Sequence, residues 1–85
     1  VFKIRIAVGS KLIPLKSYNF NGLNNLTFQK ENGLYKYFYE KTSDYQTALK
    51  NLRVARGKGY KDSFIVLFRN GFKYSLAKYL TEIEK

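Results

Sequence analysis

The sequence predicts one small α+β domain built on an antiparallel sheet, and three observations carry this prediction. Residues 2 to 8 alternate between apolar side chains and charged or small ones, which is typical of a strand with one buried face. Two further alternating segments flank Asn32-Gly33, a pair that favours the type I′ turn of a β-hairpin. Apolar residues spaced three and four apart after Ser43 indicate a helix.

The hairpin is expected to pair residues 26 to 31 with residues 34 to 40. On the second of these strands, Tyr35, Tyr37 and Tyr39 share one face, and Lys36 and Phe38 share the other with Leu34. Residues 11 to 25 form the least regular segment. We expect a loop there, with at most one helical turn over residues 18 to 21, capped by Ser17 and stopped by Gly22.

The helix after the hairpin is expected to begin at Ser43, with Gln46 completing a capping box. Its apolar residues follow the helical period and form one buried stripe. Gly57 or Gly59 should end the helix. The stripe comprises Tyr45, Ala48, Leu49, Leu52 and Ala55 or Arg56.

Residues 63 to 68 are apolar on both faces, which is typical of a central strand or of one whose second face is covered. Asn70-Gly71 predicts a second type I′ turn, after which residues 72 to 74 fold back as a short strand. Ser75 then predicts the N-cap of a terminal helix over residues 76 to 84, with Leu76, Leu80 and Ile83 as its apolar stripe.

This order of elements favours one antiparallel sheet with helices on one face. If residues 11 to 25 stand in for a first helix, the topology is a split βαβ unit. The expected fold is then ferredoxin-like (RNP-like) βαββαβ, with a shortened first helix and an extra C-terminal helix. In that arrangement the helix-free face of the sheet is the natural binding surface.

Composition narrows the functional classes. The net charge of +10 favours acidic partners such as nucleic acid, an anionic membrane surface or an anionic wall polymer, although the basic residues are spread along the chain as on an ordinary soluble surface. Eight tyrosines suggest a partly exposed aromatic surface. The chain starts at Val1 and lacks Met, so we expect a piece of a longer protein, and no segment has the pattern of a membrane span or a signal peptide.

The sequence offers no catalytic constellation. Histidine and cysteine are both absent, which removes the commonest general base, thiolate metal sites and disulfides. The carboxylates have ordinary roles in capping or solubility, and the basic glycine-rich segment 56 to 59 ends a helix, whereas phosphate loops begin one. We therefore expect a non-catalytic domain with no cofactor and no metal.

Basic side chains and an aromatic ring are expected to meet on the helix-free face. Lys3 and Arg5 share one face of the first strand, and Lys36 shares a face of the hairpin strand with Phe38. In a split βαβ sheet these two strands are neighbours. Hydrogen-bonding cations beside a flat ring suit a sugar chain or a single-stranded nucleic acid, and the alternative is an ordinary solvated face.

Taken together, these segments resemble a SPOR (sporulation-related repeat) domain, and most of all the divergent SPOR-like domains at the C-termini of N-acetylmuramoyl-L-alanine amidases of Bacteroidetes. The resemblance covers nearly the whole chain. It rests on Arg5-Ile6-Ala7, on Leu34-Tyr35-Lys36-Tyr37, on Tyr45 with Ala48 and Leu52, and on Gly59-Tyr60-Lys61-Asp62-Ser63-Phe64-Ile65-Val66.

The resemblance implies a βαββαβ fold over residues 1 to 85, a location in the bacterial cell envelope or periplasm, and binding of septal peptidoglycan. The implied ligand is a glycan strand without stem peptides, held on the sheet face, and the implied neighbour is a wall enzyme or a division protein. The expected ligand-binding residues are Lys3, Arg5, Ala7, Lys36 and Phe38. Arg5 stands where the family usually has Gln, and Glu40-Lys41 stand where it usually has a glycine.

Two other functions stay open. The two-sided apolar strand over residues 63 to 68 would also suit a module that packs on a neighbouring domain or protein, including its own catalytic domain. A single-stranded nucleic-acid binder rests only on charge and aromatic content, and we expect no nucleic-acid partner. The salt dependence of binding separates a nucleic-acid binder from a sugar binder. Nucleic-acid binding weakens steeply as the salt concentration rises, whereas docking of an uncharged sugar on aromatic rings does not.

Overall fold

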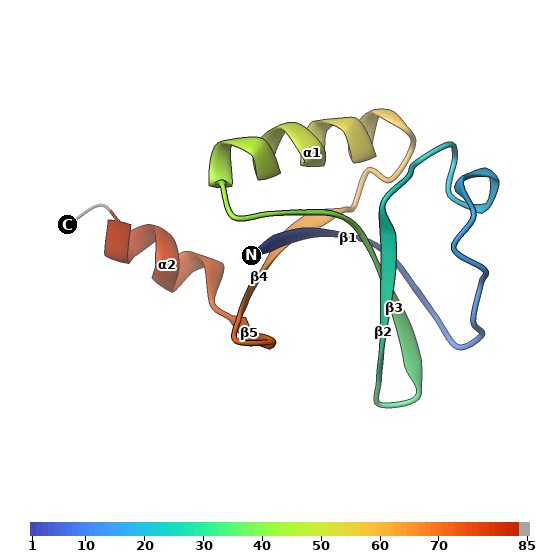
Figure 1. Cartoon of the computed structure of the whole chain (residues 1–85), viewed down its shortest axis with the longest axis horizontal. Coiled ribbons are helices and arrows are strands. Elements are labelled where there is room, and N and C mark those ends of the chain that lie inside the picture. The colour runs from blue at the N-terminus through green and yellow to red at the C-terminus, as the bar shows by residue number, and fades with distance from the viewer. Residues whose placement is uncertain (84–85) are drawn as a thin grey trace.

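The computed structural model describes residues 1 to 83 and shows an α+β fold with a curled, five-stranded antiparallel sheet (Figure 1). The strand order is β2-β3-β1-β4-β5. Two α-helices and one 3₁₀ turn complete it. The elements are β1 (Phe2–Gly9), η1 (Ser17–Asn19), β2 (Leu26–Glu31), β3 (Leu34–Thr42), α1 (Tyr45–Gly57), β4 (Phe64–Arg69), β5 (Phe72–Tyr74) and α2 (Leu76–Ile83).

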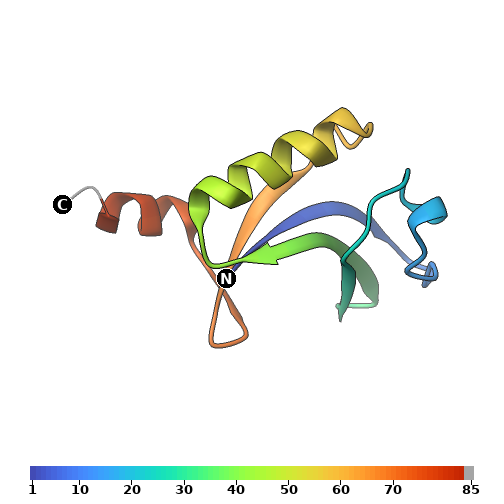
Figure 2. The same cartoon turned by 45° about the horizontal axis from the view of Figure 1, so that its top comes forward.

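Helix α1 covers one face of the sheet, and α2 lies beside it at the β4–β5 end (Figures 1 and 2). Ala48 and Ala55 are fully buried, so small side chains let α1 approach the strands closely. The core between helix and sheet is mostly aliphatic and aromatic. It comprises Phe2, Ile4, Ile6, Phe20, Leu23, Tyr37, Tyr39, Ala48, Ala55, Ile65 and Leu67.

The start of α1 differs from the prediction. Asp44, not Ser43, is the N-cap: its Oδ2 accepts hydrogen bonds from the backbone N–H of Thr47 at 3.0 Å and from the Thr47 hydroxyl at 2.6 Å. The predicted capping box between Ser43 and Gln46 is therefore wrong, because a carboxylate one residue later satisfies the helix terminus. The predicted stripe is confirmed, and of the two predicted ends, Gly57 and Gly59, the helix ends at Gly57.

Residues 11 to 25 contain one 3₁₀ turn in place of a first helix, and Ser17 lies inside that turn rather than capping it. The turn places Phe20 and Leu23 in the core, where they are 2% and 3% exposed. The Phe20 ring packs against the Tyr37 ring with centroids 5.2 Å apart. These two side chains thus fill the space beneath the sheet that a missing helix would leave open.

The Tyr37 hydroxyl fixes the path of the same segment. It donates to the Lys11 carbonyl at 3.1 Å and accepts from the Ile13 N–H at 2.7 Å. A β3 side chain therefore satisfies two backbone groups of a loop that has few partners of its own.

Both predicted hairpins are confirmed. Asn32 and Gly33 have φ values of 53° and 78°, and Asn70 and Gly71 have φ values of 51° and 81°. Positive φ at both central positions is the requirement of the type I′ turn, which only glycine and asparagine meet at low cost.

The terminal helix begins as predicted, with the Ser75 Oγ accepting from the Lys78 N–H at 3.1 Å. Leu76 and Tyr79 pack on the α1 side of the sheet, and the Tyr79 ring meets Phe2 edge-on at 5.4 Å. The opposite face is therefore not covered by α2. The predicted last residue of this helix, at position 84, lies outside the described residues.

The coarse prediction of an antiparallel α+β fold is confirmed, whereas the finer βαββαβ ferredoxin-like arrangement is not reproduced as a whole. Within the described part, a 3₁₀ turn stands between β1 and β2, and β5 adds an edge strand beyond β4. The irregular segment over residues 11 to 25 accounts for the first departure, and the Asn70-Gly71 turn accounts for the second.

Replacing Phe20 by Ala should destabilise the domain by about 3–5 kcal/mol, because it leaves a cavity under β3. Tyr18→Ala is the matched control in the same turn: Tyr18 is 79% exposed, and its loss should change the free energy of unfolding by less than about 0.5 kcal/mol. Urea unfolding followed by circular dichroism measures both. Equal values for the two variants would show that the segment does not pack as described.

Candidate ligand-binding surface

The helix-free face of the curled sheet forms the inner, concave side of the molecule, and we call it the concave face. Residues opposite one another on paired strands share a face, so the strand register identifies its members. They come from all the strands. The concave face carries Lys3, Arg5, Thr27, Gln29, Glu31, Lys36, Phe38, Phe64, Val66, Phe68 and Lys73.

Two phenylalanines form the floor of the concave face. Phe38 on β3 and Phe68 on β4 meet edge to face with ring centroids 5.5 Å apart, and they are 1% and 8% exposed. The Lys3 ammonium lies 5.7 Å from the first ring and 5.2 Å from the second. A cation over two ring faces is attracted by their quadrupoles, which keeps Lys3 on the floor.

Arg5 lies next along β1 and contacts a third ring. Its guanidinium carbon is 4.8 Å from the centroid of Phe64, a side chain that is 43% exposed. Within residues 1 to 83, neither Lys3 nor Arg5 lies within 4.0 Å of a carboxylate. Their charges are thus available to a ligand that enters the concave face.

An ion-pair triad joins the two edge strands across the curl. Glu31 on β2 approaches Lys36 on β3 with Oε1 at 3.3 Å and Lys73 on β5 with Oε2 at 3.4 Å. These lysines lower the pKa of the Glu31 carboxyl, Lys36 more than Lys73, and the neighbouring Lys36 lowers the pKa of Lys73. We call this triad the clasp, because β2 and β5 are opposite edges of the sheet.

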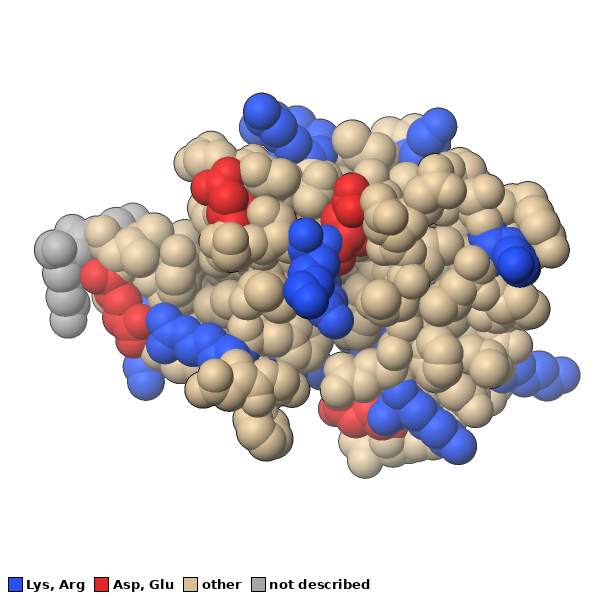
Figure 3. Space-filling view, in the orientation of Figure 1, with Lys and Arg blue, Asp and Glu red and all other residues tan. Residues whose placement is uncertain are grey.

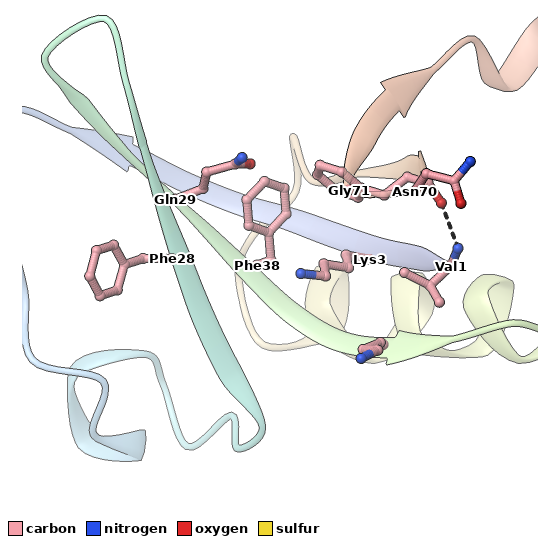
Figure 4. Close-up of a pocket in the computed structure, with 9 residues that line it drawn as sticks. Val1, Lys3, Phe28, Gln29, Phe38, Asn70 and Gly71 are labelled. Atoms are coloured by element: carbon pink, nitrogen blue, oxygen red, sulfur yellow. Dashed lines mark hydrogen bonds between the residues drawn. The ribbon is translucent and has the colours of Figure 1, made fainter.

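A hollow of about 470 Å³ opens on the concave face (Figure 4). Lys3 and Phe38 lie beneath it, Gln29 lies on the β2 side, and the Asn70-Gly71 turn lies on the other side. Phe28 also lines the hollow, and its ring lies on the other side of β2 from Phe38. The volume is in the range of small-ligand sites, and charged, amide and aromatic groups line it.

The predicted site residues fall into two groups. Lys3, Arg5, Lys36 and Phe38 share the concave face, as their alternation along β1 and β3 predicts. Ala7 does not: the register shifts between Arg5 and Ala7, so Ala7 lies opposite Tyr37 and packs against the core. The expectation that Ala7 lies on the binding face is wrong, because a bulge reverses the direction of the side chains that follow it.

The expected exposed aromatic surface is only partly present. Tyr37 and Tyr39 are buried in the core on the other face of the sheet, and Phe38 is buried against Phe68 on the concave face. Phe64 keeps an accessible ring on the concave face, whereas Tyr18 and Phe72 are exposed elsewhere. Stacking of a ligand on Phe38 would therefore require the curl to open.

Four residues of the concave face were not predicted as site residues: Glu31, Gln29, Phe68 and Lys73. The alternation within each strand places every one of them on a definite face, and the Asn-Gly turns fix the register of both hairpins. What the sequence does not carry is the curl, which brings β2 toward β5.

Basic side chains stand apart from one another over the molecule in Figure 3, so the net charge does not gather on that view. In the part of the chain that the structure describes, no His, Cys, Asp and Glu side chains cluster as metal ligands. Neither described helix is long and apolar enough to cross a membrane.

No protein-family model, no curated protein and no solved structure matches this chain.

Lys36→Met should raise the pKa of Glu31 toward its ordinary value, and Lys73→Met should raise it less, because Lys36 is the larger cause of the lowering. A folded-state pKa below the unfolded value means that the clasp stabilises the fold above the unfolded pKa and stops doing so as the pH falls through the folded pKa. Carboxyl ¹³C shifts measured against pH report the pKa of Glu31.

Lys30→Met is the matched control, since Lys30 points to the other face of β2 and contacts the Tyr35 ring. It should leave the titration of Glu31 unchanged. If all three variants titrate alike, the clasp does not form in solution.

Proposed function

We propose that the chain is a non-catalytic, peptidoglycan-binding domain of the bacterial cell envelope, which binds glycan strands on its concave face and localises a cell-wall enzyme or a division protein. The proposed parent is an N-acetylmuramoyl-L-alanine amidase. One observation carries the proposal: Lys3, Arg5 and Lys36 gather on the helix-free face of a sheet, beside a hollow with a polar and aromatic lining.

The backbone supports the resemblance behind this proposal. Strand β1 lies between β3 and β4, as a split βαβ unit requires. Glu40 has a φ of 60° and occupies a place where the SPOR pattern usually has glycine, the residue that adopts positive φ most readily. The first helix is replaced by η1, and Phe20 and Leu23 keep the sheet covered without it.

The chemistry of the concave face suits a sugar chain. Lysine and arginine donate several hydrogen bonds each, and the Gln29 amide both donates and accepts, so ring hydroxyls and N-acetyl carbonyls find partners. Phe64 offers an accessible ring beside Arg5 for the apolar side of a sugar. Arg5, in place of the family's usual Gln, adds charge where the first strand meets the ligand.

A second candidate function is docking on a neighbouring domain or protein. The sequence suggested β4 as the docking surface, but the curl buries Phe68 on that strand. The observation that favours docking is instead the segment before η1. Exposed apolar side chains there are Leu12, Ile13 and Leu15, and Tyr18 is exposed within η1 itself. A module of this kind would show no retention on purified sacculi, so the experiment below separates the two functions.

The double variant Arg5→Ala/Lys36→Ala should lose most of its binding to isolated sacculi while keeping the wild-type fold. The physical reason is the loss of two donors from one face, each worth about 1.5–3 kcal/mol when a charged group is hydrogen-bonded. Co-sedimentation with sacculi, with and without prior amidase treatment, measures the effect, and thermal unfolding checks the fold.

Lys50→Ala/Arg53→Ala is the matched control, since it removes the same charge from exposed positions of α1. It should bind sacculi like the wild type. Equal binding by the two double variants would remove the concave face as the site. Binding that disappears in both as salt rises would instead indicate a general electrostatic attraction.

A further inference from the structure

The clasp shows that the concave face already holds a carboxylate, that of Glu31, between two lysines. Glu31 places one oxygen near each of two lysines, Oε1 near Lys36 and Oε2 near Lys73. The two ammonium groups are thus spaced to share the two oxygens of one carboxylate. Lys36 is largely covered, with 15% of its side chain exposed, whereas Glu31 is 38% exposed and can move away into solvent.

We propose that the concave face takes a glycan chain bearing carboxylates, and that Glu31 is a built-in competitor that a ligand carboxylate displaces from Lys36 and Lys73. The inference rests on the proposed function for the sugar chain and adds the charge of that chain. Displacement exchanges one ion pair for another, so the lysines stay neutralised in both states. Release of Glu31 also breaks the side-chain link between β2 and β5.

The remaining charges of the concave face favour the same ligand class. Lys3 and Arg5 rest on phenylalanine rings without a carboxylate partner in the described chain, and Lys41 also lines the hollow. A chain with one acid group would leave these cations unpaired, whereas repeated acid groups along the chain can meet several. A polyanionic glycan thus fits the distribution of charge better than a neutral one.

The rings argue against a single-stranded nucleic acid. Sequence-tolerant binding of single strands depends on exposed rings on which successive bases stack. Phe38 and Phe68 are buried against each other, and the accessible rings are Phe64 on β4, beside Arg5, and Phe28 on β2, at the edge of the sheet. The concave face can therefore supply charge to a nucleic acid but no platform of several rings.

The test compares Glu31→Gln with the wild type by calorimetric titration of oligogalacturonate, a chain of sugar acids. Glu31→Gln should bind roughly three to ten times more tightly, because the ligand no longer competes with an internal carboxylate. Adding Lys73→Met to Glu31→Gln should reverse the gain. A neutral chitin oligosaccharide should show no gain with either variant.

Glu82→Gln is the matched control, since it adds the same net charge on α2, where Glu82 contacts Arg69 and Tyr74. It should change the affinity for oligogalacturonate by less than about twofold. Unchanged or weaker binding by folded Glu31→Gln, or no binding by either protein, would overturn the inference. A larger gain for an oligothymidine strand would assign the site to nucleic acid instead.

These outcomes are independent of the sacculus experiment. Retention on sacculi that depends on Arg5 and Lys36, without a gain from Glu31→Gln, would contradict the competitor role and leave the proposed function standing. A gain on oligogalacturonate by a protein that no sacculus retains would contradict the proposed function and leave the anionic-glycan site standing.

Discussion

The contact between Phe38 and Phe68 is the constraint on which the concave face depends. These rings belong to β3 and β4, which flank β1, and in a flat sheet such strands lie roughly 10 Å apart. Their ring centroids lie 5.5 Å apart, so the two side chains meet across β1 on the inside of the curl. The curl buries both rings and lets the edge strands approach closely enough for Glu31 to reach Lys73. The hollow, the clasp and the position of the basic side chains around them depend on this packing arrangement.

Burial of apolar residues on both sides of the sheet explains how so short a chain forms a stable sheet without disulfides. On the α1 side the core includes Phe20 and Leu23, which come from a segment without regular secondary structure except η1. On the concave side the phenylalanine pair buries apolar area that a two-layer domain normally leaves to solvent. Lys3 closes this second small core from above, and its position over the rings couples the fold to the charge of the surface.

The sequence carries the local information well, since side-chain alternation, Asn-Gly turns and helical spacing each depend on neighbouring residues. Hence the hairpins, the α1 stripe and the shared face of Arg5 and Lys36 were predictable. Two of the misses depend on contacts between distant segments. Ala7 turns toward the core because of a bulge between β1 and β3, and Phe38 is buried by a ring from β4. Asp44 replaced Ser43 as the cap because two adjacent residues could both serve, and only the backbone path selects one.

The clasp also bears on how the free edges of the sheet behave toward other molecules. Strands β2 and β5 each leave one row of backbone donors and acceptors without a partner strand, which is the usual starting point for edge-to-edge aggregation. Glu31 ties these edges to each other through Lys73, and β5 is only three residues long. A second copy that tried to extend the sheet at β5 would find a short edge bearing a charged, already engaged lysine. The ion pair on the concave face thus makes the β5 edge a poor template for an added strand.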